Sequence, residues 1–234
     1  MKVIFRCPPE LKGLIPEPIP ARRGLPDWLK AMPTKVDSAD LGFEVETVKQ
    51  CPPFVDAMSA GFLIPLAADI QVKDGTFSWD WDPPATTLTG YTRAPMAVHV
   101  ADQLVETPFF EADTYAVKFI NYWTVELPNG FGLLCTHPVN RADLPFRAVT
   151  GFVHADNYHN FVHFPAQWVD RDFNGVLKRG TPVAQCMPVP LENLDLVFET
   201  LEGEAADRFN ETKTAVRAGA GAYRKHHRQR RSGG

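Results

Sequence analysis

The sequence predicts a mainly β protein: a single barrel-like or jelly-roll domain of the β-clip kind, with a proline-rich N-terminal arm and a C-terminal helix. The 234 residues include 21 prolines, which interrupt helix interiors because they lack an N–H donor, and 11% of the residues are aromatic. About ten short segments alternate apolar and polar residues, which is the period of a half-buried strand. Glycine and proline separate these segments, as they do in turns between short strands.

Residues 1–40 are predicted to form the arm. Residues 8–35 contain seven prolines and almost no periodicity, so their backbone is expected to be extended and irregular. Residues 25–32, LPDWLKAM, can form one helical turn with Pro26 at its first position. Because a solvated linker would normally lack Trp28 and Leu29, we expect the arm to pack on the domain.

The β domain is predicted to span residues 41–200. Residues 42–49 alternate Phe43, Val45 and Thr47 with acidic side chains, and Asp74-Gly75 marks a hairpin turn. The sequence Pro-Asn-Gly at 128–130 marks a second turn. Short strands are expected within residues 61–66, 68–75, 76–81, 114–138, 148–155, 160–166, 173–180 and 181–190.

A surface helix is predicted over residues 201–222, followed by a disordered basic tail over residues 223–234. The helix has acids in its first turn, bases in its last turn and Gly219 as a stop. Residues 224–234 carry five Lys or Arg and no acid, so the rest of the chain holds 19 bases against 28 acids, a net charge of −9. An acidic body is not a nucleic-acid-binding face, but the tail could contact phosphate or an acidic partner by charge alone.

The chain is expected to be a soluble cytoplasmic protein. No apolar run reaches the roughly 18 residues of a membrane span, and Arg6 with two following prolines interrupts the N-terminus before a signal-peptide core. The cysteines are far apart and form no Cys-x-x-Cys pair, which favours buried free thiols over a zinc ribbon or a disulfide framework. They are Cys7, Cys51, Cys135 and Cys186.

A histidine-rich stretch at residues 151–167, GFVHADNYHNFVHFPAQ, raises the question of a metal site. His154 and Asp156 share one face of an extended strand, the His-x-Asp spacing with which iron(II) oxygenases present two ligands. His163 or His137 could supply a third ligand, to iron or to zinc. The alternatives are a polar turn between two strands, in which Asp156 closes an Asx turn, or a histidine that acts without metal.

The segment HPVNRADLPF, residues 137–146, is a second polar cluster between apolar strands. Arg141, together with the nearby Arg147, could grip a carboxylate or a phosphate with two parallel hydrogen bonds. The alternative is an ordered loop in which Asp143 and Asn140 cap turns.

Two motifs about thirty residues apart connect this region with a known family. The first is the turn that contains Gly151, Asp156 and Tyr158, and the second is the segment GTPVAQ, residues 180–185, which ends at Gln185. Over about 40 residues the chain resembles the dUTPase and dCTP-deaminase family. The resemblance implies the family's β fold, a nucleotide ligand and a trimer.

The chain departs from that family at two functional positions. The carboxylate that positions the attacking water in the family falls at His154, and no serine-rich phosphate-binding loop is found. The hydrolase chemistry is therefore not expected to carry over with the fold. The whole chain also resembles an uncharacterised family of phage and bacterial genomes, in residues 48–66 (VKQCPPFVDAMSAGFLIPL), 137–151, 180–190 and 221–228.

Three functions follow as alternatives. The first is a β domain that binds a small anionic or nucleotide-like molecule, with or without catalysis. In that case His154, Asp156 and Tyr158 are the catalytic candidates, and Arg141, Arg147 and Gln185 are the ligand-binding candidates. The second is a metal-dependent enzyme resembling an iron(II) oxygenase. The third is a non-catalytic phage structural or assembly protein.

Overall fold

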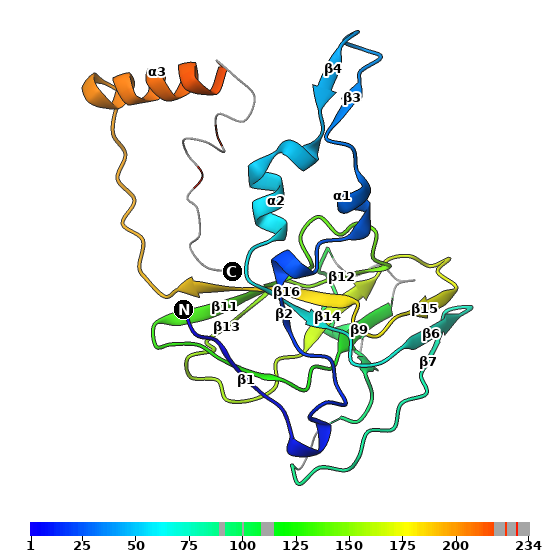
Figure 1. The fold of residues 1–234 in the computed structure, drawn as a ribbon. Helices are drawn as coiled ribbons and strands as arrows, with labels where there is room; N and C mark the ends of the chain where they lie inside the picture. The colour runs from blue at the N-terminus through cyan, green and yellow to red at the C-terminus, as the bar shows by residue number, and fades with distance from the viewer. Residues whose placement is uncertain (89–91, 100, 109–114, 218–222, 224–227, 229–234) are drawn as a thin grey trace. The chain divides into compact units, whose positions relative to one another are not determined.

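A computed structural model describes residues 1–234 except 89–91, 100, 109–114, 218–222, 224–227 and 229–234 (Figure 1). The chain divides into two compact units, one made of Met1–Leu25 with Met58–Glu192 and the other of Pro26–Ala57 with Asn193–Gly234. The described secondary structure is mostly strand, which confirms the mainly β prediction. The predicted boundaries at residues 40, 200 and 222 stay predictions.

The largest sheet of the first unit has five antiparallel strands. Their order is β13 (Gly151–Val153), β11 (Phe131–Thr136), β16 (Pro182–Pro190), β5 (Phe62–Pro65) and β2 (Ile19–Pro20) (Figure 1). The nine residues of β16 pair with β11 on one side and with β5 on the other, so this strand is the centre of the sheet.

Three smaller sheets complete this unit. The first has the order β12 (Phe146–Ala148), β14 (Phe164–Trp168), β9 (Tyr115–Phe119) and β8 (Met96–Val98). The second has the order β15 (Gly175–Leu177), β6 (Ile70–Lys73) and β7 (Thr76–Ser78), and the third pairs β1 (Ile4–Arg6) with β10 (Thr124–Glu126). Among the described strands, none of these sheets closes on itself into a barrel.

One hydrophobic core joins the sheets. It includes Ile64, Val72, Phe119, Leu133 and Trp168, which come from three different sheets and are all buried. The alternation expected from the sequence is present in β6, where every second side chain is buried. In the hairpin that follows, Asp74 and Gly75 both have positive φ angles, 48° and 73°, as a tight primed turn requires.

The proline-rich N-terminus is divided between the two units. Short 3₁₀ turns, η1 (Pro9–Leu11) and η2 (Ala21–Arg23), lie in the first unit, where Leu11, Ile15 and Ala21 are buried. The apolar residues of this segment thus form part of the β unit's core. A further 3₁₀ turn of the first unit, η4, spans Ala101–Leu104.

The second unit contains the helices α1 (Asp27–Ala31) and α3 (Gly203–Arg217) and most of α2 (Pro52–Met58). It also contains the hairpin β3 (Lys35–Asp37) with β4 (Glu44–Glu46) and the turn η3 (Val48–Gln50). The predicted C-terminal helix is confirmed, and none of its residues is buried. No helix in the described part of the chain has the length and apolar character needed to cross a membrane. The predicted basic tail lies, apart from Tyr223 and Arg228, outside the described residues.

Candidate ligand-binding pocket

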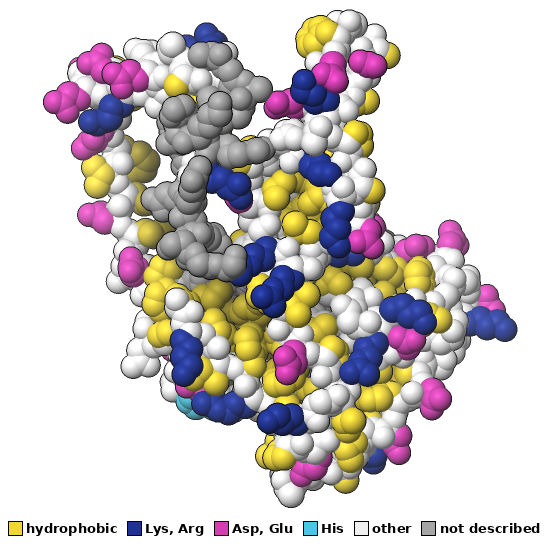
Figure 2. Space-filling view, viewed as in Figure 1, with side chains coloured by type: hydrophobic (Ala, Val, Ile, Leu, Met, Phe, Trp, Pro, Cys, Tyr) yellow, Lys and Arg dark blue, Asp and Glu magenta, His cyan; other side chains and the backbone are white. Residues whose placement is uncertain are grey.

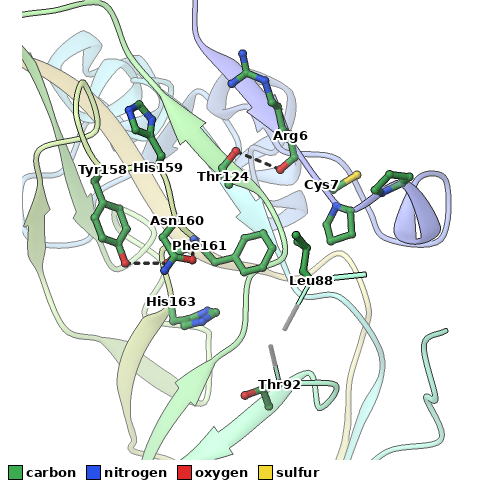
Figure 3. A pocket seen from close by; sticks show the side chains of 12 residues that line it. Arg6, Cys7, Leu88, Thr92, Thr124, Tyr158, His159, Asn160, Phe161 and His163 are labelled. Atoms are coloured by element: carbon green, nitrogen blue, oxygen red, sulfur yellow. Dashed lines mark hydrogen bonds between the residues drawn. The ribbon is translucent and has the colours of Figure 1, made fainter. Parts of the chain in front are cut away.

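The first unit contains an open pocket of about 640 Å³ (Figure 3). Figure 3 shows Arg6 and Cys7, from the N-terminal segment, on one side and side chains of residues 158–163 on the other. The volume falls within the range of pockets that hold small molecules. The lining residues come from four segments of the chain: Arg6, Cys7, Pro8, Pro9, Leu88, Thr92, Thr124, Tyr158, His159, Asn160, Phe161 and His163.

The backbone of residues 154–161 is folded by local hydrogen bonds. The N–H groups of Asn157 and Tyr158 both donate to the carbonyl of His154, at 3.0 and 2.9 Å. The Asn160 side-chain oxygen accepts the N–H of Phe161 at 2.7 Å, and Phe161 forms an isolated bridge with Thr124 of β10. The histidine-rich stretch is therefore a turn, and its second half forms one wall of the pocket.

His163 is held in one protonation state at this wall. Its Nδ1 accepts the backbone N–H of Asn121 at 3.2 Å. Burial lowers the pKa of His163, and the charge of Lys118 lowers it further. The neutral ring that results carries its proton on Nε2, because Nδ1 is the acceptor. His163 therefore gives the pocket a lining group with an N–H donor.

The charges of the lining favour neutral or anionic ligands. Arg6 is the one described lining residue with a permanent charge, and its guanidinium forms an ion pair with Glu126. Among the described residues of the lining there is no Asp or Glu. Cys7 is a weak candidate for a nucleophile, because burial raises the pKa of its thiol and keeps it protonated.

Two of the residues singled out in the sequence, Tyr158 and His163, line this pocket. His154 and Asp156 do not. Asp156 Oδ2 accepts the N–H of Gly130 at 3.1 Å, while His154 is exposed beside the Phe152 ring, with 5.6 Å between the ring centroids. Within the described part of the chain, no three His, Cys, Asp or Glu side chains are grouped so that they could hold a metal ion. The iron or zinc site expected from His154, Asp156, His163 and His137 thus has no support.

His137 is held by the backbone on both sides of its ring. Nε2 donates to the carbonyl of Arg141 at 2.9 Å, and Nδ1 accepts the N–H of Ala148 at 3.2 Å. Burial lowers the pKa of His137, and the neighbouring charge of Arg147 acts in the same direction. With both nitrogens engaged, His137 is a structural residue of this loop and not an open metal ligand.

The two arginines predicted to bind a ligand also lie away from the pocket lining. Arg141 makes a forked ion pair with Asp143, with N···O distances of 2.8, 3.1 and 2.8 Å. Arg147 is an exposed residue of β12. The segment 137–143 therefore forms the ordered loop that was one of the two expectations.

Gln185 is buried, with 1% of its surface exposed, and its amide joins two other segments of the chain. Its side-chain oxygen accepts the N–H of Val139 at 3.0 Å, and its Nε2 donates to the carbonyl of Ala60 at 2.8 Å. These bonds tie the central strand β16 to the loop after β11 and to the residues before β5.

Sequence reasoning missed most of the other lining residues. Arg6 and Thr124 are brought together by the pairing of β1 with β10, in which they are register partners. They are more than a hundred residues apart, so no local pattern in the sequence connects them. Asn160 and Phe161 lie within the histidine-rich stretch, but the prediction of a metal site there rests on its histidines and its carboxylate.

No family model matches the chain, and no curated protein matches it. Several solved structures have low similarity to this chain, and phage dUTPases are among them. A mutant dUTPase of Staphylococcus bacteriophage 80alpha has a TM-score of 0.29 and 15% identity, over 47% of this chain and 89% of that one. A second mutant of the same enzyme has a TM-score of 0.32 and 14% identity, over 61% and 86%.

A dUTPase from phage phi11 of S. aureus, described with a structural Mg(II) ion, has a TM-score of 0.27 and 16% identity over 47% of this chain and 98% of that one. The TM-scores of the three structures lie between 0.27 and 0.32. At such values they assign neither a ligand nor a reaction to this chain.

Proposed function

We propose that this chain binds a small, planar, negatively charged molecule of the nucleotide class in the pocket lined by residues 6–9 and 158–163. The observation that carries the proposal is the combination of ring-shaped side chains with an arginine among the described residues of one lining.

The ring-shaped side chains suit a planar group. Tyr158, His159, Phe161 and His163 all line the pocket, and the Phe161 and His163 rings lie 6.4 Å apart at an angle of 45°. Stacking of a base on an aromatic side chain contributes about 1–3 kcal/mol and tolerates different bases. The sequence resemblance of residues 151–190 to enzymes of nucleotide metabolism favours the same ligand class.

The polar groups of the lining suit the rest of such a ligand. Asn160 and Thr124 offer an amide and a hydroxyl for a hydrogen-bonding edge, and neutral His163 offers an N–H. Arg6 supplies positive charge for a phosphate, which would compete with Glu126 for the guanidinium. Among the described lining residues we identify no carboxylate general base, and the thiol of Cys7 is protonated, so the proposal is limited to binding.

A thermal-shift screen followed by calorimetry tests the proposal. The panel contains nucleosides (a base without charge), nucleoside mono-, di- and triphosphates, and ribose 5-phosphate (charge without a base). We expect the unfolding temperature to rise with nucleotides in a concentration-dependent way, and to rise less with either half of the molecule.

Three variants locate the binding. Arg6→Met should weaken binding of the phosphorylated ligands by about 10- to 100-fold and leave nucleoside binding almost unchanged, because a charged hydrogen bond contributes about 1.5–3 kcal/mol. His159→Gln should weaken binding, whereas the matched control His154→Gln, outside the lining, should not. If no ligand of the panel binds at millimolar concentration, or if Arg6→Met and His159→Gln bind as well as the parent, the proposal is wrong.

A second candidate is the assembly role, and exposed apolar residues favour it. In the segment 191–201, Leu194 is 85% exposed and Phe198 is 90% exposed, with Leu196 and Val197 also largely exposed. Figure 2 shows hydrophobic and acidic side chains alternating along this segment, between β16 and α3. Contiguous exposed apolar residues commonly mark an interaction site.

Light scattering over a range of concentrations tests this second candidate. The parent should self-associate, either as the trimer that the sequence resemblance implies or with another number of copies. The double variant Leu196→Glu/Phe198→Glu should lose this self-association. A chain that is monomeric at all concentrations would exclude self-assembly.

All four cysteines are free thiols, which fits a reducing compartment, and the cytoplasm is our proposed place of action.

A further inference from the structure

Cys135 and Cys186 face each other across the centre of the main sheet. They are register partners in the antiparallel ladder between β11 and β16, flanked by the pairs Leu134–Met187 and Thr136–Gln185. Register partners direct their side chains to the same face of a sheet. The two sulfur atoms lie 3.6 Å apart.

Both thiols lie in the main hydrophobic core, with 4% and 0% of the residue surface exposed. The Cys186 S–H group donates to Cys135 Sγ, and the Cys135 S–H group donates to the carbonyl of Leu133 at 3.9 Å. Burial raises the pKa of Cys186 well above its usual value, and the neighbouring thiol raises it further. In the closed native state Cys186 is therefore protonated and slow to react.

The backbone geometry suits a covalent bond between the two residues. Directly opposed residues in an antiparallel pair have Cα atoms about 4.5 or 5.5 Å apart, and disulfides bridge Cα atoms about 4.4–6.8 Å apart. A bond needs the sulfur atoms to approach from 3.6 Å to about 2.05 Å, and rotation about χ1 of the two cysteines is the movement that we expect to bring them together.

We propose that Cys135 and Cys186 form a reversible cross-strand disulfide with a low-molecular-weight disulfide, such as oxidised glutathione, as the oxidant. One thiol loses its proton and attacks a sulfur of the oxidant, which gives a mixed disulfide and releases one reduced thiol. The second thiolate then attacks the protein sulfur of the mixed disulfide and displaces the second reduced thiol. Two electrons and two protons pass from the protein to the oxidant.

The bond would link strands whose cysteines are 51 residues apart in the chain, with the histidine-rich turn between them. A cross-link over such a loop removes conformations from the unfolded chain and so stabilises the fold. Gln185, next to Cys186, holds the loop after β11 and the residues before β5. The redox state of the pair would thus set the stability of the sheet from which that turn extends.

The test uses the full chain with Cys7→Ser and Cys51→Ser, so that only the pair remains. The protein is refolded from urea in glutathione buffers of increasing oxidised fraction, because refolding gives the oxidant access to thiols that the native core covers. Acid quenching, alkylation and mass spectrometry then count the free thiols, and peptide mapping identifies the link. We expect both thiols to disappear together, and the unfolding temperature to rise by on the order of 5 °C and to fall again with dithiothreitol.

Two control variants separate the disulfide from a general effect of the buffer. In the same background, Cys135→Ser should stay reduced or bind one glutathione, with no rise in the unfolding temperature. Cys135→Ala/Cys186→Ala keeps the core apolar and should not respond to the redox buffer. The proposal is overturned if correctly folded protein from the most oxidising buffer keeps two alkylatable thiols, or if the linked form unfolds at a lower temperature than the reduced form.

Discussion

At the scale of the residue, the histidines differ in what holds their ring nitrogens. His137 has a backbone partner on each nitrogen, and His163 has one, from Asn121. His154, which had been the first candidate for a metal ligand, is exposed beside Phe152. Substitution of these residues should therefore have different consequences for stability.

Replacement of His137 by alanine should lower the free energy of unfolding by about 2 kcal/mol. The change leaves the carbonyl of Arg141 and the N–H of Ala148 without their partner in a partly buried loop, and unpaired groups of this kind cost about 1–3 kcal/mol. Urea unfolding followed by circular dichroism measures the difference. His154→Ala serves as the control and should change stability by less than about 0.5 kcal/mol. Equal losses in the two variants would contradict the structural role of His137.

The protein should become less stable as the pH falls below about 6.5, the pKa of histidine in an unfolded chain. Burial lowers the pKa of both His163 and His137 in the folded state, so the unfolded chain binds more protons in the window below that value. This contribution is fully present above pH 6.5 and is lost as the pH falls toward the folded-state pKa values. His163→Gln keeps an acceptor for the Asn121 N–H but does not titrate, so its unfolding temperature should fall less between pH 7 and pH 5.

The matched control for that measurement is His159→Gln, an exposed histidine of the same segment. It should keep the pH dependence of the parent. If His163→Gln loses as much stability as the parent over this pH range, the burial of His163 does not produce the effect.

The residue types that carry chemistry were visible in the sequence, but their partners were not. Tyr158 and His163, both in the histidine-rich turn, line the pocket. The engagement of His137 with Ala148, and of Asp156 with Gly130, depends on how strands distant in sequence meet. A pattern along the chain identifies a side chain that is able to bind, and only the fold shows whether the backbone already occupies it.

At the scale of the element, the approach of β5 to β16 depends on one glycine. Gly61, just before β5, has φ = 67°, and a Cβ atom there would lie 2.0 Å from the carbonyl oxygen of Cys186. Gly130, before β11, also has a positive φ, 81°, but a Cβ atom would meet nothing within 4 Å. A comparison of the two glycines therefore separates the cost of a positive φ angle from the cost of close packing.

Gly61→Ala should therefore destabilise the protein much more than Gly130→Ala. Both changes carry the cost of a positive φ, about 1 kcal/mol, and only the first forces two backbones apart, which adds about 1–3 kcal/mol. Denaturant unfolding of the two variants and the parent measures the cost of the positive φ angle in Gly130→Ala and the sum of both costs in Gly61→Ala. A loss in Gly61→Ala no larger than in Gly130→Ala would mean that the two strands separate at no cost.

Elements with a strong local signal were predictable, and elements set by distant contacts were not. The Asp74-Gly75 hairpin and the helix after residue 200 follow from turn chemistry and from the placement of charges. The helix α2 begins at two prolines, which are more typical of irregular segments, and it was not predicted from the sequence. Residues 42–49 do contain a strand, β4, but it pairs only with β3 among the described strands and belongs to the second unit.

At the scale of the whole molecule, the buried residues are concentrated in the first unit. Every member of the two hydrophobic clusters belongs to that unit. No described residue from Asn193 to the C-terminus is buried. The hydrophobic contribution to stability, about 25 cal/mol per Å² of apolar surface removed from water, therefore comes mainly from the β unit.

A chain that ends at Glu192 should keep the fold of the β unit and its pocket. As far as these residues are described, removal of residues 193–234 takes away no buried side chain, so the unfolding temperature should change by less than about 2 °C. The described residues of the pocket lining lie within residues 6–163, so the truncated chain should bind the ligands of the parent with the same affinity. Deletion of Met1–Leu11 is the contrasting change, because it removes β1, the buried Leu11 and four lining residues, and it should prevent stable folding. Differential scanning calorimetry measures the unfolding temperatures of the two truncated chains and the parent. A large fall in the unfolding temperature on removal of residues 193–234 would show that the β unit depends on the C-terminal segment.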